Sequence, residues 1–318
     1  MSTFTKWPEL PSELREHSLS YFKAQELYLY AQFSKQCNEE IQKFNKVAPN
    51  YLSVRELDNG NDGILISASY PSDHHFYLFF VAASENSHKF VRSFNGLADW
   101  NGRFENHNIL EGNARQTAFE YLEKLLKYTT NTKIGEVRIN CREWPYEELK
   151  RIPAIFKVSN WNIKMYPSMC DAFMNFIIET TNVRKLVLSA DRMNHRVMTL
   201  SAQFFESNFF KQLEHADFSL KAMISNEHFL SSKAKILRFQ CDTISETAVN
   251  QKIQNWCETQ IDLNFEITLG DDRRWNQDVI LHDLQFEVNE RQCKIQRNDG
   301  KTGIVQFFAG RLKFNGSN

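Results

Sequence analysis

The chain has 318 residues, of which 42% are hydrophobic and 24% are charged, and its formal net charge is −1. This is the composition of a globular protein with a sizeable core, and the balanced charge argues against a general affinity for nucleic acid or anionic membranes. The chain contains no run of about twenty apolar residues, as a membrane span requires, and its first residues lack the apolar core of a signal peptide. We therefore expect an intracellular protein, cytoplasmic, nuclear or both, without nucleic acid or membrane among its partners.

Residues 1–50 predict a small helical head. Leu10 and Pro11 precede a helix that Ser12 can cap, and two further runs before Pro49 show apolar residues at helical spacing. The residues that recur on one face of the first helix are Leu14, Ser18 and Phe22. A unit this small buries too little apolar surface to be stable alone. We expect it to dock on a partner or, as the alternative, to cap the rest of the chain.

Residues 51–133 predict a small β meander followed by a helix. Apolar runs separated by turn-forming clusters indicate the strands, which are Tyr51–Leu57, Ile64–Ile66, Phe76–Ala82 and Lys89–Phe94. Asn113 is a suitable N-cap for the helix that follows. The apolar stripe of this helix comprises Ala118, Tyr121, Leu122, Leu125 and Leu126.

From residue 134 to residue 268, short apolar strands alternate with helices. The predicted strands are Ile134–Ile139, Ile163–Tyr166, Val183–Ser189, Ala216–Leu220, Ala234–Phe239 and Leu263–Thr268. The predicted helices are Tyr146–Arg151, Ser168–Thr180, Ser201–Leu213, Ser225–Ser231 and Ile244–Glu258. The strand spacing of roughly twenty to thirty residues is the interval of leucine-rich repeats.

Two architectures fit this alternation: a curved solenoid of stacked strand and helix units, or a parallel sheet covered by helices. The chain has 11 glycines and lacks the glycine-rich first turn that a doubly wound sheet usually has. We therefore favour the solenoid.

Residues 285–318 predict an antiparallel ending. Asn298-Asp299-Gly300 separates two alternating runs, and such a turn needs the positive φ that these residues tolerate. A last strand is expected over Arg311–Phe314. A hairpin at this place is expected to cap the open end of a repeat stack, where an apolar face would otherwise meet water.

Residues that could carry catalysis or bind a metal are scattered. The adjacent His74 and His75 point to opposite sides of a strand, and the paired carboxylates at 271–272 stand beside two arginines, which is typical of a solvated loop. The histidines without a nearby Ser or Cys motif are His195, His215 and His228. The 6 cysteines form no Cys-x-x-Cys pair and are expected to be reduced, mostly buried thiols. We assign no catalytic residue and no metal ligand.

The head of the chain resembles the F-box. That family starts with Leu-Pro, places Glu-Leu three and four positions after the leucine, and follows with a leucine-rich second helix and a Ser-Lys or Ser-Arg entry to the third. The residues that fall on this pattern are Leu10, Pro11, Glu13, Leu14, Leu19, Phe22, Leu27, Leu29, Phe33, Ser34, Lys35 and Ile41. Ser18 departs from it, because Ile or Leu usually stands there, and no Trp follows Lys35.

The end of the chain resembles the F-box-associated domain of the large nematode-expanded F-box families. The similarity lies in Ile-x-Arg-Asn-Asp-Gly-Lys at 295–301, the apolar strand after it and the closing Leu312-x-Phe314. The two resemblances imply a mixed α+β or α/β protein. They imply a three-helix F-box over 1–50, a linking region over 51–133, and a leucine-rich-repeat-like α/β domain over 134–318 that ends in a β-hairpin.

The resemblance implies a non-catalytic, substrate-binding subunit of an SCF-type (Skp–cullin–F-box) ubiquitin ligase. The head would dock on a Skp-type adaptor and, through it, on cullin, while the C-terminal domain binds a protein substrate; no cofactor is implied. The implied docking residues are Leu10, Pro11, Leu14, Leu19, Phe22, Leu27, Phe33 and Ile41. The alternatives are a repeat-type interaction scaffold without a ligase link, and a hydrolase or transferase whose site is assembled from loops.

Overall fold

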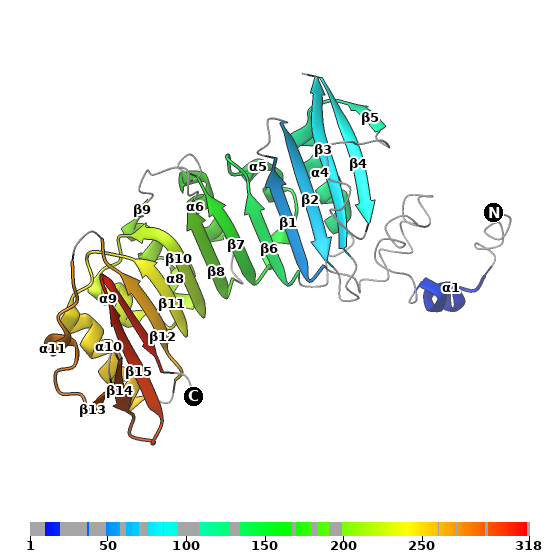
Figure 1. The fold of residues 1–318 in the computed structure, drawn as a ribbon. Coiled ribbons are helices and arrows are strands. Elements are labelled where there is room, and N and C mark those ends of the chain that lie inside the picture. The colour runs from blue at the N-terminus through cyan, green and yellow to red at the C-terminus, as the bar shows by residue number, and fades with distance from the viewer. Residues whose placement is uncertain are drawn as a thin grey trace. The chain divides into compact units, whose positions relative to one another are not determined.

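The computed structural model describes residues 10–19, 37, 49–57, 62–69, 75–84, 86–94, 108–127, 134–166, 170–179, 183–190, 199–259, 261–270, 273–289 and 292–316. The protein has a mixed α/β fold in which strands predominate, so the prediction is confirmed at this level (Figure 1). The chain divides into two compact units, residues 1–140 with 145–159 and residues 141–144 with 160–318.

Helix α1 spans Ser12–Leu19 in the first unit. Its first backbone hydrogen bonds run from the N–H groups of Leu14 and Arg15 to the Pro11 carbonyl, at 3.1 Å each. Pro11, rather than Ser12, therefore takes the cap position, and Ser12 is the first helical residue. The other two helices predicted for the head lie outside the described residues, apart from the helical residue Cys37.

The first unit contains the predicted meander. The first five strands pair in chain order, each antiparallel to the one before, and β6 pairs parallel to β1. The strands are β1 (Tyr51–Glu56), β2 (Gly63–Ser69), β3 (His75–Ser84), β4 (Ser87–Phe94), β5 (Asn108–Glu111) and β6 (Glu136–Asn140). Between β5 and β6 the chain forms α4, which supplies the crossover that a parallel pair requires. The unit also contains α5 (Tyr146–Lys150) and a 3-10 turn (Ile155–Lys157).

Helix α4 (Ala114–Lys127) packs on β2, β3 and β4. Asn113 caps it as predicted: its Oδ1 accepts hydrogen bonds from the N–H groups of Arg115 at 2.8 Å and Gln116 at 3.2 Å. The buried residues of the predicted stripe are Ala118, Leu122, Leu125 and Leu126. Burial of this stripe covers one side of the meander, so the helix forms here because of its partner surface as well as its cap.

The second unit is a sheet whose parallel strands follow one another in chain order. Five strands pair in the order β7-β8-β10-β11-β12, all parallel, and the short β9 adds to β10. These strands are β7 (Asn160–Met165), β8 (Lys185–Ala190), β9 (Thr199–Leu200), β10 (His215–Ala222), β11 (Ile236–Gln240) and β12 (Asn264–Thr268). The helices among them are α6 (Cys170–Glu179), α7 (Ala202–Glu206), α8 (Asn208–Gln212), α9 (Asn226–Ser231) and α10 (Glu246–Glu258).

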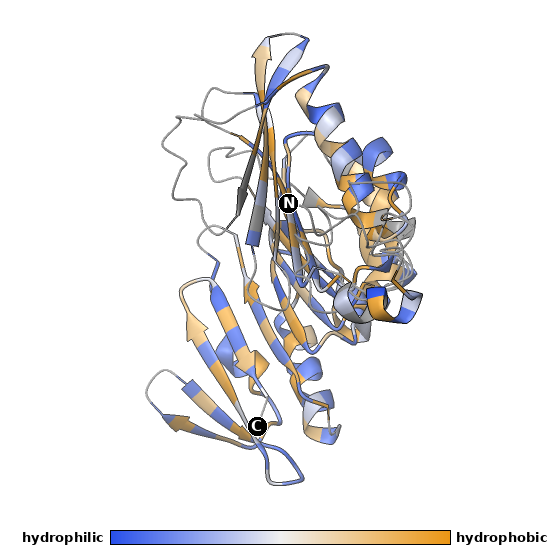
Figure 2. Cartoon of the chain, turned by 90° about the vertical axis from the view of Figure 1, so that its right-hand side faces the viewer, coloured by the Kyte–Doolittle hydropathy of each residue, from blue (hydrophilic) through white to orange (hydrophobic). Residues whose placement is uncertain are grey.

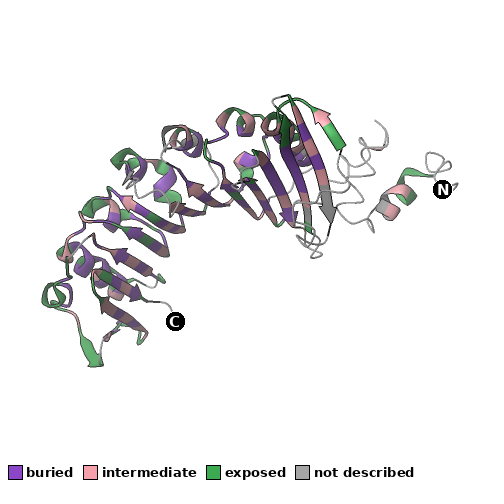
Figure 3. Cartoon of the chain, turned by 45° about the horizontal axis from the view of Figure 1, so that its top comes forward, coloured by how far each residue is buried: buried purple, intermediate pink, exposed green. Residues whose placement is uncertain are grey.

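The strands of the second unit bury every second residue (Figure 3). Apolar and polar residues alternate along them accordingly (Figure 2). Ring contacts join the buried side to the helices: Phe205 of α7 lies 6.5 Å from Phe218 of β10, and Phe229 of α9 lies 5.5 Å from Phe265 of β12. The helices therefore cover one side of this sheet, and the other side carries the alternate, polar residues.

The single helix predicted over Ser201–Leu213 is two helices, α7 and α8. Ser207 separates them with an extended conformation, φ −63° and ψ 148°, and its side chain accepts a hydrogen bond from the Phe210 N–H at 3.2 Å. A serine competes with the helical backbone in this way, which periodicity alone does not register. Phe204 and Phe209, on either side of the break, are both buried.

The chain ends in antiparallel strands, as predicted. After α11 (Gln277–Ile280) come β13 (Phe286–Asn289), β14 (Gln292–Gln296), β15 (Thr302–Phe308) and β16 (Arg311–Asn315). The predicted turn joins β14 to β15, with Gly300 at φ +87°. These strands extend the sheet, because β16 pairs with β12, and they do not close it off. The terminal strand β13 exposes 42% of Phe286 and 68% of Val288.

Lys252 is a buried cation beneath α9. Its Nζ donates hydrogen bonds to the carbonyls of Leu230 at 3.0 Å and Ser232 at 2.8 Å, and only 6% of the residue is exposed. Burial lowers its pKa from 10.5 to about 8, because the ammonium loses hydration. The folded protein therefore binds fewer protons than the unfolded chain between these pH values, and the unfolding free energy rises with pH across this window.

Replacing Lys252 with Met removes this titration. Between about pH 7.5 and about pH 10, we expect the unfolding free energy of the wild type to increase by about 2 kcal/mol relative to Lys252→Met. Urea unfolding of both proteins at the two pH values measures the change. Lys233→Met, at an exposed lysine of the same unit, serves as the control. A difference between wild type and Lys252→Met that is independent of pH contradicts the prediction.

Candidate functional site

The described part of the predicted docking set is exposed. Leu10 and Leu14, four residues apart, expose 37% and 52% of their surface, and Pro11 between them is exposed. Ser18, one turn further on the same face, is half-buried. Leu19 is the last residue of α1. The other members of the set lie outside the described residues and are Phe22, Leu27, Phe33 and Ile41.

A second surface is formed by the polar side of the sheet in the second unit. We name it the open face and define it by the partly or fully exposed alternate residues of β7, β8, β10, β11, β12, β16, β15 and β14. Neighbouring strands place these residues in lateral rows, because residues paired in register point to the same side. The central row contains Asn162, Val187, Asp217, Arg238, Glu266, Lys313, Gln306 and Gln292.

Ion pairs link charged residues across the strands of the open face. Arg238 Nη1 lies 3.0 Å from Asp217 Oδ2, and Arg311 Nε lies 3.4 Å from Glu266 Oε1. Both pairs are partly exposed, so each contributes about 1 kcal/mol or less to stability. They fix the direction of the two guanidinium groups more than they stabilise the fold.

His215 lies in the row beside Lys185 on the open face. Burial lowers the pKa of its imidazole, and the nearby Lys185 cation lowers it further. Its Nε2 is buried and has no hydrogen-bond partner among the described residues. This histidine is therefore neutral near pH 7 and lies in a positive local field.

Asp242 joins the carboxyl ends of three parallel strands. Its carboxylate lies 2.6 Å from Lys221 Nζ at the end of β10 and accepts a hydrogen bond from the Gly270 N–H after β12, at 2.5 Å. A side chain at residue 270 would displace this carboxylate, since its Cβ would lie 2.8 Å from Asp242 Oδ1. The hydrogen bond from Lys221 and that from Gly270 lower the pKa of Asp242, so this group holds the strand ends together in its charged form.

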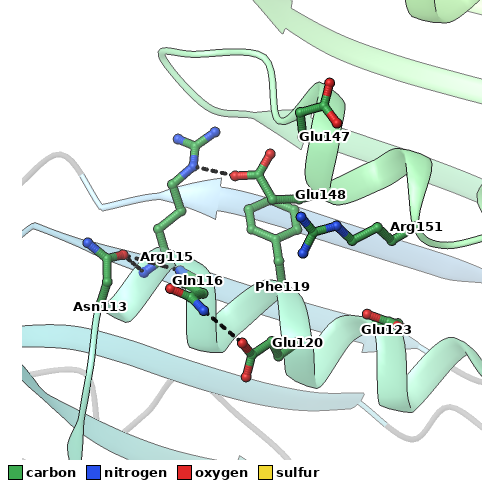
Figure 4. A pocket seen from close by; sticks show the side chains of 9 residues that line it. All are labelled: Asn113, Arg115, Gln116, Phe119, Glu120, Glu123, Glu147, Glu148 and Arg151. Carbon is green, nitrogen blue, oxygen red and sulfur yellow. Dashed lines mark hydrogen bonds and ion pairs between the residues drawn. The ribbon is translucent and has the colours of Figure 1, made fainter.

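The first unit contains a polar pocket of about 610 Å³ between α4 and α5 (Figure 4). Its lining residues are Asn113, Arg115, Gln116, Phe119, Glu120, Glu123, Glu147, Glu148 and Arg151. Arg115 lies 2.9 Å from Glu56 and 3.1 Å from Glu148, and so ties β1 and α5 to α4. The pocket offers carboxylates without a hydroxyl, thiol or imidazole among these residues, and the guanidinium of Arg115 is engaged in ion pairs. We interpret it as a structural junction.

The other polar residues singled out in the sequence do not form a common site. Of the histidines, His75 and His228 are described and lie in different units, while His74 and His195 fall outside the described residues, as do 271–272. No group of three metal-binding side chains occurs in the part of the chain that the structure describes. In the same part, none of the helices has the length and apolar character to cross a membrane. The cysteines at 37, 141, 241, 257 and 293 are thiols, and those at 141, 241 and 293 are buried.

Comparison of the chain with protein-family models, with curated proteins and with solved structures returns no match. Function is therefore inferred from α1 and from the open face.

The open face is not predicted by the sequence patterns. A signal for it is present in the sequence, since most of the half-exposed residues of these strands are polar or charged, with Val187 and Ile236 among the exceptions. Asp217 and Arg238 are separated by 21 residues along the chain, however, and become neighbours only through the register of β10 and β11. A pattern within one strand does not contain that register.

Asp242→Asn tests the role of the strand-end carboxylate. Because its folded-state pKa lies below the ordinary 3.8, the charged group stabilises the fold above that pH and loses its effect as the pH falls. We expect the variant to be about 1 kcal/mol less stable than wild type at neutral pH, with a smaller difference at about pH 3. Chemical unfolding at both pH values measures this.

Glu214→Gln is the matched control, because Glu214 forms a more exposed pair with Arg184 at 3.6 Å. An equal loss of stability in both variants, or a difference for Asp242→Asn that does not shrink in acid, contradicts the role given to Asp242.

Proposed function

We propose that this chain is the substrate-recognition subunit of an SCF-type ubiquitin ligase, with residues around 8–46 docking on a Skp-type adaptor and, through it, on cullin. The observation that carries the proposal is the pair of exposed leucines at the start of α1, with Leu10 two residues before the helix and Leu14 within it. Exposed apolar side chains beside a proline-capped helix start are expected where another protein covers them. Burial of each leucine by the adaptor would stabilise the complex by about 2 kcal/mol.

The proposal includes a finer description of the fold: a three-helix F-box at the head and a leucine-rich-repeat-like, F-box-associated domain over 134–318. Parallel strands that pair in chain order, with helices on one side, support the repeat-like description. In a doubly wound sheet the order of the strands would reverse at some point. The order β7-β8-β10-β11-β12 contains no reversal.

In this role the chain makes and breaks no bond. It raises the effective concentration of a substrate lysine near a ubiquitin-charged enzyme that the partner complex supplies. The open face is the surface that we assign to the substrate, because it is broad and polar and has side chains of both charges. The docking residues belong to the first unit and the open face to the second, so the two partners have no residue in common.

The alternative is an interaction scaffold without a ligase link. Such a scaffold would bind its partner through the same open face, which forms independently of α1. It differs from the ligase subunit only in that Leu10 and Leu14 bind no adaptor.

Adaptor binding separates the two functions. The full chain, produced together with adaptor and the N-terminal part of cullin, is expected to co-purify with both. Pro11→Ala with Leu14→Asp should lose them, because a carboxylate at residue 14 would have to be buried without a partner. Ser18→Ile should bind more tightly, by about tenfold, since a serine at this position gives up roughly 1 to 3 kcal/mol of apolar burial.

Ile261→Asp is the matched control, because it introduces a carboxylate at an apolar residue of the second unit that is 58% exposed. Absence of adaptor from the wild-type sample overturns the ligase assignment and leaves the scaffold. Equal loss in the α1 variant and in Ile261→Asp also contradicts the assignment, because the effect would not belong to α1.

A further inference from the structure

We propose that the open face binds an acidic, extended segment of a partner protein. The proposal rests on the proposed function only in calling this partner the substrate, and it names the class to which that substrate belongs. Binding to the open face does not require the adaptor, so the two proposals fail separately.

Basic side chains outnumber carboxylates on the open face, although the whole chain has a net charge of −1. The basic residues of this face are Lys164, Lys185, Lys221, Arg238, Lys294, Arg311 and Lys313. The carboxylates among its described residues are Asp217 and Glu266, and Glu287 on β13 adds a third, opposite Lys294 in register. The acidic excess of the chain therefore lies elsewhere, and the open face has a positive field.

Internal pairing leaves this positive charge in place. Asp217 is paired with Arg238 and Glu266 with Arg311, so both carboxylates of the open face are already neutralised, and Lys221 is paired with Asp242 at the strand ends. Among the described residues, Lys185 and Lys313 form no ion pair, since Glu266, which lies opposite Lys313 in register, is paired with Arg311. The pKa of His215 is lowered chiefly by burial, and the Lys185 cation beside it in register lowers this pKa further. A carboxylate of a partner would supply the missing countercharge at both lysines.

The positions of the two lysines suit an extended chain. Lys185 is on β8 and Lys313 is on β16, with β10, β11 and β12 between them. At about 4.8 Å per strand, this separation is roughly 19 Å, which an extended peptide covers in about six residues. Ile236 on β11 is half-exposed between the lysines, and Val187 is half-exposed beside Lys185 on β8, so apolar residues of the segment have contacts there.

An exposed phenylalanine lies beside an arginine at the Lys313 end of the open face. Phe308 is 45% exposed, and the guanidinium of Arg311 lies 4.9 Å from its ring centroid. Such a pair presents an apolar surface beside positive charge, which suits a segment that combines acidic and apolar residues.

The same surface is a poor match for nucleic acid. Asp217 and Glu266 lie in the central row, between the basic residues, where a continuous phosphate backbone would pass over them. A peptide can place neutral residues at these positions, whereas a nucleic acid has a charge at every nucleotide. We therefore assign the face to a protein segment.

Fluorescence anisotropy with the purified full chain tests the proposal. The probe is a fluorescein-labelled peptide of about ten residues in which glutamate and valine alternate, so that its carboxylates lie on one side when it is extended. We expect binding that weakens as sodium chloride rises from about 50 mM to about 500 mM. Lys185→Glu with Lys313→Glu should raise the Kd by about tenfold or more.

The matched control is Lys211→Glu with Lys233→Glu. It makes the same change in net charge at exposed lysines in α8 and in the connection from α9 to β11, away from the open-face rows. We expect it to bind like the wild type. Lys185→Gln with Lys313→Gln gives a milder form of the test variant, and an unfolding midpoint equal to that of wild type shows that a loss of binding is not a loss of folding.

Three results would overturn the proposal: no binding of the probe by the wild type at low salt, an equal loss in the test and control variants, or tighter binding of a thymidine oligonucleotide of similar length. The test variant should still co-purify with the adaptor. Failure of adaptor binding by the wild type, with the peptide result intact, removes the ligase assignment alone.

Discussion

The strands of the second unit bury their side chains on one side only, and the strand register and the lateral rows of the open face depend on this constraint. Each strand from β7 to β12 places every second side chain beneath helices and turns the rest to the opposite side. A slip of one residue in register would exchange the two sets, so the apolar core fixes the register strongly. The lateral rows of the open face, including the pair of Asp217 and Arg238, follow from that register.

Trp256 of α10 connects the parallel part of this sheet to its antiparallel end. Its ring lies 5.1 Å from that of Phe314, and its Nε1 donates a hydrogen bond to the Gly316 carbonyl at 3.1 Å. Arg297 lies over the same ring at 5.0 Å and forms two hydrogen bonds with Asp299, whose pKa it lowers to about 2. The Arg-Asn-Asp-Gly motif thus has a packing role: it fixes the turn after β14 and presents the arginine to the tryptophan.

The sequence predicted well what depends on local chemistry. Asn113 begins a helix because its side chain satisfies free N–H groups, and Asn298-Asp299-Gly300 forms a turn because Gly300 tolerates a positive φ. It failed where two local preferences compete. The apolar periodicity over 201–213 predicts one helix, but Ser207 caps a new helix and divides the segment in two. It did not predict the open face or the pocket between α4 and α5. Arg115 and Glu56, for example, are 59 residues apart and meet only in the folded unit.

Hydrogen exchange of the full chain, with and without the adaptor, tests the central claim most directly. If the exposed leucines at the start of α1 become buried in a complex, the exchange of amides in residues 8–46 should slow by at least about tenfold, while the strands of the open face exchange as before. This pattern would establish that the head receives the adaptor and leaves the C-terminal sheet available for a substrate. Unchanged exchange in residues 8–46 at saturating adaptor, or protection confined to the C-terminal sheet, would contradict the account.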